Sequence, residues 1–183
     1  MSSLRERIAE ERGRLKSVRL LLSAALEDDS AQDGADRTGF YIAVGDYLEA
    51  AMERLHRQDV RMTALLEEKA DLSTPEAQQA MSELAERLAG NQHYLDRYLE
   101  AKRALESDGT AAIEQYESAA TDYTRYIVNN MGHHAGSVDL ARAAFSAEDW
   151  ADMAFVSDSE AELEQRLFDA VTAATPESLQ TDR

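Results

Sequence analysis

The segment VGDYLEAAMERLHRQDVRMTALLEEKA, residues 44–70, has hydrophobic side chains at intervals of three and four residues. This spacing places them on one face of an α-helix, whereas a half-buried strand would show strict alternation. The inward-facing positions are Val44, Leu48, Ala51, Met52, Leu55, Met62 and Leu66. The segment therefore predicts a long amphipathic helix, whose hydrophobic face has to pack against further helices.

The same spacing predicts helices on both sides of this segment. The breaks between them are the polar stretch DDSAQDGADRTG (28–39), the residues around Ser73-Thr-Pro-Glu76, and Ser107-Asp-Gly-Thr110. Ser73–Glu76 has the pattern of a capping box with proline in the first turn, which is a strong helix start. The predicted helices are 3–28, up to 70, 73–106 and a fourth from Ile113 to Ala141, followed by short helices at Ser146 and at 158–173.

The composition indicates an all-α fold. The chain has only two prolines, eight glycines and eleven valines plus isoleucines in 183 residues. Few helix breakers and few β-branched residues favour helices over strands. Four main helices with short connections predict an antiparallel up-down four-helix bundle with one or two short extra C-terminal helices. We expect one domain over residues 1–172 and a flexible tail over 173–183.

The chain is strongly acidic. It has 36 Asp and Glu against 19 Lys and Arg, a formal net charge of −17, and only three of the basic residues are lysines. Excess carboxylate with scarce lysine indicates adaptation to high salt, because at molar salt the Debye length falls to about 3 Å and self-repulsion is screened. The same charge disfavours binding to nucleic acids and to membrane surfaces.

Several classes of protein are disfavoured by what the sequence lacks. Without cysteine there are no disulfides, thiolate zinc sites or cysteine nucleophiles. No stretch approaches the ~20 apolar residues of a membrane helix, and the charged N-terminus MSSLRERIAEERGRLK (1–16) has no signal-peptide core. No Gly-rich phosphate loop or nucleophile elbow is present. We therefore expect a cytoplasmic protein that is not an enzyme.

Four stretches carry a resemblance to a known family. They are IAEERGRLKSVRLLLSAAL (8–26), NQHYLDRYLEAKRALESDG (91–109), AAIEQYESAATDYTRYIVNNMGHH (111–134) and DLARAAFSAEDWADMAF (139–155). They resemble the first helix, the third helix, the fourth helix and the following segment of the hemerythrin-like family, also called the HHE cation-binding family. The resemblance implies a bundle that binds two non-haem irons, with histidine on the first and third helices and His-x3-Glu on the second and fourth.

At nearly every implied ligand position this chain departs from the family pattern. The first-helix histidine is replaced by Arg12, which cannot bind a cation. The second helix offers either Leu55 and Asp59 or, in a register shifted by one residue, His56 and Val60. The third-helix position is Gln92, with His93 turned about 100° away. The fourth-helix pair is Asn130 and His134. We interpret the di-iron ligand set as degraded.

The residues at these positions are expected to satisfy one another in an interior polar cluster. We expect Arg12 to pair with Asp59 or Glu11, and Gln92, Asn130 and His134 to form hydrogen bonds, because an unpaired buried charge is costly. His134, His56 and His93 are the candidate metal ligands, and three imidazoles could form an open zinc or iron site.

The sequence supports three functional hypotheses. The first is a non-enzymatic sensor, binding or interaction module without a metal cofactor, which takes a small molecule or a protein partner. The second retains a non-haem iron or a single divalent metal, held by His134, His56 and Glu11 or Asp59, and senses or carries O2, NO or redox state. The third is a structural homodimer or adaptor.

Overall fold

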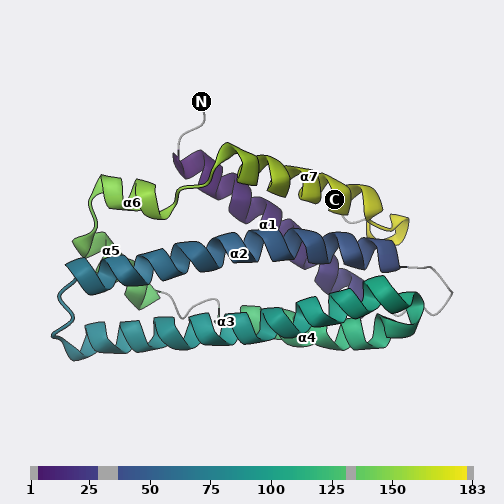
Figure 1. The fold of residues 1–183 in the computed structure, drawn as a ribbon, viewed down its shortest axis with the longest axis horizontal. Coiled ribbons are helices and arrows are strands. Elements are labelled where there is room, and N and C mark those ends of the chain that lie inside the picture. Colours follow the sequence, from purple (N-terminus) through teal and green to yellow (C-terminus); the bar gives the residue numbers. More distant parts are fainter. Residues whose placement is uncertain (1–3, 29–36, 131–134, 181–183) are drawn as a thin grey trace.

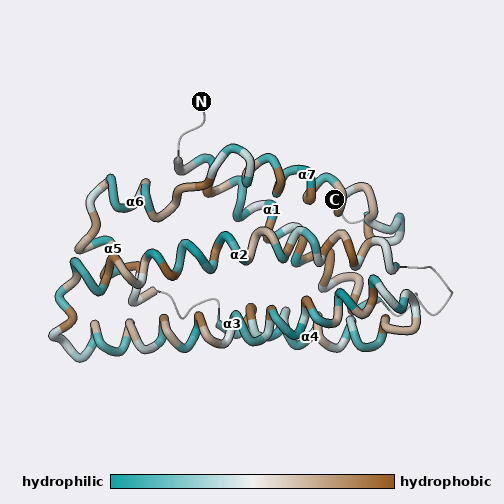
Figure 2. The backbone as a smooth tube through the Cα atoms, in the orientation of Figure 1, coloured by the Kyte–Doolittle hydropathy of each residue, from teal (hydrophilic) through white to brown (hydrophobic). Residues whose placement is uncertain are grey.

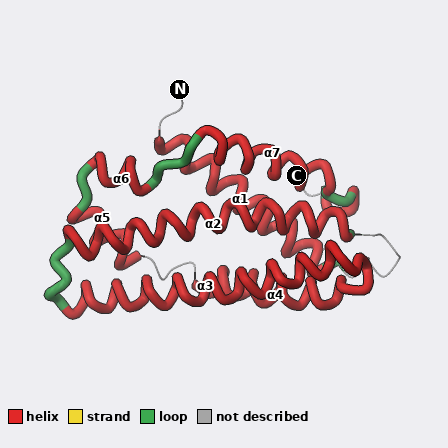
Figure 3. Tube along the Cα trace, viewed as in Figure 1, coloured by secondary structure: helices red, strands yellow, loops and turns green. Residues whose placement is uncertain are grey.

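The computed structural model describes residues 4–28, 37–130 and 135–180, and in these ranges it is all-helical without strands (Figures 1 and 3). No described helix is long and apolar enough to cross a membrane. The α-helices are α1 (Leu4–Glu27), α2 (Thr38–Lys69), α3 (Pro75–Asp108), α4 (Ile113–Asn130), α5 (Ala135–Ala144), α6 (Ala147–Met153) and α7 (Asp158–Ala174). Two 3-10 helices, η2 (Gly109–Ala112) and η3 (Glu177–Leu179), complete the described chain.

Helix α2 is the central element. It packs against α3 and α7 and also contacts α1, α5 and α6, while α4 packs along α3 and touches α1 (Figure 1). The prediction of a short closing helix at 158–173 therefore understated α7, which lies along α2. The expected flexible tail over 173–183 stays a prediction, although part of it packs against the domain. Thr175 is buried, and Leu179 of η3 packs against the core.

Local sequence explains where the helices begin and end. Helix α3 starts at Pro75, within the predicted Ser73–Glu76 start, but its N-cap is Thr74 and not Ser73. The Thr74 side chain accepts a hydrogen bond from the Ala77 backbone N–H. Helix α3 ends before Gly109, which has a φ of 59°, a conformation that glycine adopts without steric cost. Ser146 starts α6 with a complete capping box.

The described residues of the predicted fourth helix fall in two helices. Helix α4 ends at Asn130 and α5 begins at Ala135. Gly132 and His134 lie outside the described residues. Gly136 lies in α5, where an added Cβ would come 3.0 Å from the Cβ of Ala80, so the small residue permits close packing of α5 on α3.

Hydrophobic residues recur along each long helix (Figure 2), and the inward positions of residues 44–70 are confirmed, except that Leu55 is only half-buried. Tyrosines occupy much of the main core. Tyr98 and Tyr116 join through their hydroxyls at 2.6 Å, and Tyr98 stacks on Tyr123 with 5.4 Å between ring centroids. These five core tyrosines have less than 3% of their surface exposed: Tyr41, Tyr47, Tyr98, Tyr116 and Tyr123.

Candidate functional site

A cavity of about 380 Å³ lies among helices α1 to α6, and Met52 of the main core is part of its lining. Most of the surface area of its wall is apolar. The chain's only tryptophan, Trp150 of α6, is part of this wall. The hydrophobic lining residues are Ile8, Leu15, Met52, Leu55, Met62, Ile127, Val138, Trp150, Met153 and Ala154. The polar lining residues are Glu11, Arg12, Arg19, Arg54, Gln58, Asp59, Arg87, Asn91, Tyr126 and Asn130.

The structure brings four residues of the predicted polar cluster to this cavity, namely Glu11, Arg12, Asp59 and Asn130. Gln92 is not among them. Its side chain is exposed and donates a hydrogen bond to Asp96 at 2.7 Å. The preceding residue, Asn91, lines the cavity in its place, because one residue along a helix turns the side chain by about 100°.

The predicted pairing of Arg12 is corrected by the structure. Asp59 pairs with Arg87 of α3 at 3.0 Å, and Glu11 pairs with Arg54 of α2 at 3.3 Å. Arg12 itself is exposed and makes no hydrogen bond or ion pair within the described ranges. Because it both lines the cavity and meets solvent, Arg12 lies at the cavity's opening.

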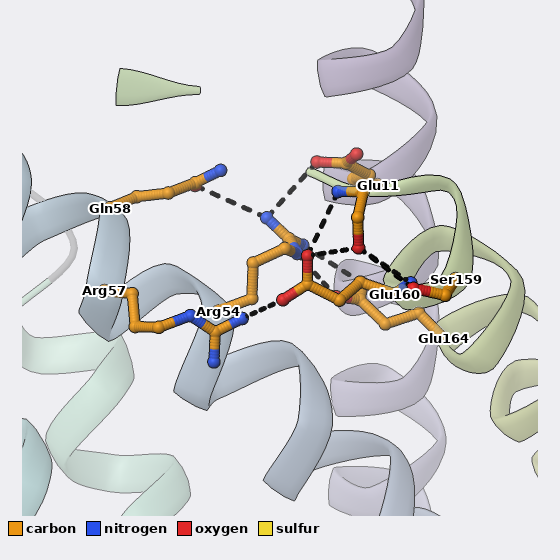
Figure 4. Close-up of polar contacts among 8 residues, drawn as sticks. Glu11, Arg54, Arg57, Gln58, Ser159, Glu160 and Glu164 are labelled. Atoms are coloured by element: carbon orange, nitrogen blue, oxygen red, sulfur yellow. Dashed lines mark hydrogen bonds and ion pairs between the residues drawn. The ribbon is translucent and has the colours of Figure 1, made fainter. Parts of the chain in front are cut away.

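Arg54 is the most deeply buried cation at the site. Its side chain is held by Glu164 of α7, with Nε to Oε1 at 2.5 Å and the second contact at 3.1 Å, and by Gln58 at 3.4 Å (Figure 4). Burial acts to lower the pKa of Arg54, but the hydrogen bond and charge of Glu164 raise it above its ordinary value. The guanidinium therefore stays charged and joins α1, α2 and α7 beside the cavity.

Sequence reasoning missed Arg54 and Arg87. Arg54 falls three residues after Ala51 on the inward face of α2, which is a position where a charged residue signals a buried partner. That partner, Glu164, is on a helix 110 residues away. Arg87 lies one turn before Asn91 on α3, and its Nε is buried without a hydrogen-bond partner among the described residues.

Helix α6 forms part of the cavity wall and is anchored from outside. Its capping residue Asp149 accepts a hydrogen bond from Lys69 at 2.5 Å. Hydrogen bonds from Lys69 and then from Ser146 lower the pKa of Asp149 to about 2.

Ion pairs continue along α2 in the order Lys69–Asp149, Arg61–Asp152, Arg57–Glu160 and Arg54–Glu164. Along this series the residue numbers fall on α2 and rise on its partners, so α2 runs antiparallel to the segment 149–164.

Neither of the two histidines that the structure describes lines the cavity. His56 is half-buried on α2, and its Nδ1 has no hydrogen-bond partner among the described residues. His93 is exposed on α3 and packs edge-on to Tyr94 at 5.3 Å. His134 lies outside the described residues. In the part of the chain that is described, no three His, Asp or Glu side chains are placed to hold a metal ion.

Tyr126 links the cavity to its neighbouring helices. Its hydroxyl donates to the Arg87 backbone carbonyl at 3.2 Å, its own carbonyl accepts from Asn130 at 2.8 Å, and its ring stacks on Tyr94. Gly90 makes this possible, since a Cβ at that position would collide with the Tyr126 hydroxyl. The cavity wall is thus fixed by specific contacts between α3 and α4.

Comparisons of the chain with protein-family models, curated proteins and solved structures found no match. The site is a mainly apolar cavity with charged and amide groups at a few positions, and both of its described carboxylates are already paired with arginines.

Proposed function

We propose that this chain is a small-molecule-binding module, a sensor or binding protein whose ligand occupies the cavity beside Trp150. The observation that carries the proposal is a mainly apolar cavity of about 380 Å³ between the helices, with Arg12 at its opening. Small-molecule sites are commonly concave, apolar and roughly 300–1,000 Å³ in volume, with a few polar groups that orient the ligand.

We propose binding and not catalysis because of the groups that line the cavity. Its described lining residues include no serine, threonine, cysteine, lysine or histidine. The carboxylates of Glu11 and Asp59, which could act as acids or bases, are each committed to an arginine. A general base has to be free to reach the proton it abstracts.

We also propose the finer architecture, a hemerythrin-like antiparallel four-helix bundle of α1 to α4 with α5, α6 and α7 added. Support comes from the positions that correspond to family ligands, since Arg12, Asp59 and Asn130 line one cavity although they come from three helices. The described residues there do not fit two irons. The positive charges of Arg54 and Arg87 would repel a metal ion. These two arginines are also already paired with the carboxylates of Glu11 and Asp59.

Binding can be measured from the fluorescence emission of Trp150. Titration with N-phenylnaphthylamine, a neutral apolar fluorophore that accepts energy from tryptophan, should quench Trp150 emission and saturate at one molecule per chain. Val138→Phe places a larger side chain in the cavity wall and should abolish this quenching. The matched variant Val60→Phe, at an exposed position outside the lining, should not.

Two results would end the proposal. One is the absence of saturable quenching in the wild-type chain, and the other is equal quenching in the two valine variants when both retain wild-type circular dichroism. Metal analysis of the purified chain tests the second hypothesis: one metal ion per chain would support it, whereas two irons per chain would restore the family chemistry.

A further inference from the structure

The charge of the cavity lining is opposite to that of the chain. Arg12, Arg19, Arg54 and Arg87 line the cavity against the carboxylates of Glu11 and Asp59. The described lining thus has four positive and two negative side chains in a protein of net charge −17. An excess of arginines around a mainly apolar cavity favours a ligand that carries negative charge.

Not all of this positive charge is available to a ligand. Arg54 is held by Glu164 and Glu11, and Arg87 is paired with Asp59 through one terminal nitrogen. The Nε of Arg87 remains buried without a hydrogen-bond partner in the described ranges, and Arg12 makes no polar contact there. Two guanidinium groups that line the cavity, one on α1 and one on α3, therefore keep donors without an acceptor among the described residues.

Asn91 adds a third unsatisfied group. It lies one helical turn after Arg87, and its side-chain oxygen is buried without a partner among the described residues. A rotation of the amide would present its NH2 group as a donor instead. Guanidinium and amide donors together form hydrogen bonds that suit a carboxylate, and such charge-assisted bonds are about twice as strong as neutral ones.

We infer that the ligand is an apolar-bodied monoanion, an alkyl or aryl carboxylate, whose head group binds Arg12, Arg87 and Asn91 while its body lies against the apolar wall that includes Trp150. This inference rests on the proposed function and names the class of ligand. A single charge is favoured over a phosphate dianion because Arg54 and Arg87 are already paired with carboxylates.

The test compares three compounds with the same alkyl body: decanoate, decanol and decyltrimethylammonium, each below its micelle concentration. Each competes with N-phenylnaphthylamine for the cavity, read from Trp150 emission. Decanoate should bind at least about tenfold more tightly than decanol, which corresponds to about one charge-assisted hydrogen bond. The cation should bind most weakly.

Arg12→Gln should bring decanoate affinity down toward that of decanol and leave decanol unchanged. Arg14→Gln is the matched control, because Arg14 lies on the same helix, bonds Gln165 and does not line the cavity. Equal binding of decanoate and decanol, preference for the cation, or an equal effect of both arginine variants would overturn the inference while the fluorophore still binds. Failure of the fluorophore itself would remove the proposed function as well.

Discussion

Arg54 of α2 and Glu164 of α7 form a buried bidentate ion pair, with only 5% and 3% of their respective surfaces exposed. Glu11 of α1 approaches the same guanidinium at 3.3 Å. This cluster fixes α7 on α2 and supports one side of the cavity. Removing one member of this cluster should lower the stability of the fold strongly, because a buried charge is costly without its partner.

Removing one partner of this pair should be far more harmful than removing both. We expect Glu164→Ala to lower the free energy of unfolding by about 3–5 kcal/mol, and Arg54→Met combined with Glu164→Leu to restore most of that loss. Urea unfolding measures both. Arg57→Met breaks the exposed Arg57–Glu160 pair and should cost less than about 1 kcal/mol. A double variant as unstable as Glu164→Ala would contradict the expectation.

Two identical tyrosine substitutions in the core should have different effects. The Tyr116 hydroxyl donates to the Tyr41 backbone carbonyl at 3.0 Å, so the proton between Tyr98 and Tyr116 has to come from Tyr98. Tyr116→Phe breaks both bonds and should cost about 1–3 kcal/mol. Tyr123→Phe removes a hydroxyl that has no hydrogen-bond partner among the described residues and should be neutral or stabilising. Thermal unfolding measures both variants, and an equal loss of stability in the two would contradict this prediction.

Alanine at two helical glycines should separate close packing from helix propensity. Gly90→Ala would push Tyr126 from its place, and overpacking of this kind costs about 1–3 kcal/mol. Gly13→Ala in α1 meets nothing within 4 Å and should stabilise the chain by about 0.5–1 kcal/mol. Gly90→Ala should also weaken binding of N-phenylnaphthylamine, because Tyr126 lines the cavity. A stabilising Gly90→Ala would refute this description of the α3–α4 contact.

The anchoring of α6 should depend on pH through Asp149. Its pKa is lowered from 3.8 to about 2, so the folded state favours the ionised form. A depressed pKa in the folded state stabilises the fold above the unfolded value, and this contribution is lost as the pH falls through the folded value. The stability advantage of the wild type over Asp149→Asn should therefore be constant above about pH 3.8 and shrink between 3.8 and 2. Urea unfolding at several pH values that shows a constant advantage down to pH 2 would contradict it.

Periodicity was sufficient to predict the helices but not how α7 packs. The hydrophobic positions of residues 44–70 mark the buried face because each helix repeats every 3.6 residues. Helix α7 carries Glu164 and a few hydrophobic residues on the face toward α2, so its sequence alone resembles that of a short peripheral helix. Its packing combines the ion pair with Arg54 and the contacts of Phe168 and Val171 with the core, all between residues far apart in sequence.

For the site, the sequence identified the helices and most of the positions but not the pairings. Glu11, Arg12, Asp59 and Asn130 were predicted to meet, and they line the same cavity. The prediction of Gln92 was wrong by one residue. Asn91 lines the cavity, whereas Gln92, turned by about 100° around the helix axis, is exposed to solvent. The pairs Arg87–Asp59 and Arg54–Glu11 could not be predicted, since many arginines and carboxylates compete at helical spacing. Adaptation to high salt stays a prediction.

The most direct test of the central claim is a nitrogen–proton correlation spectrum recorded with and without N-phenylnaphthylamine. If the cavity is the binding site, the indole signal of Trp150 and the side-chain amides of Asn91 and Asn130 should shift, because all three residues line it. The amides of Gln79 and Gln165, exposed on α3 and α7, should stay unchanged. Shifts confined to Gln79, Gln165 or other exposed positions, with Trp150 unaffected, would contradict an interior ligand site.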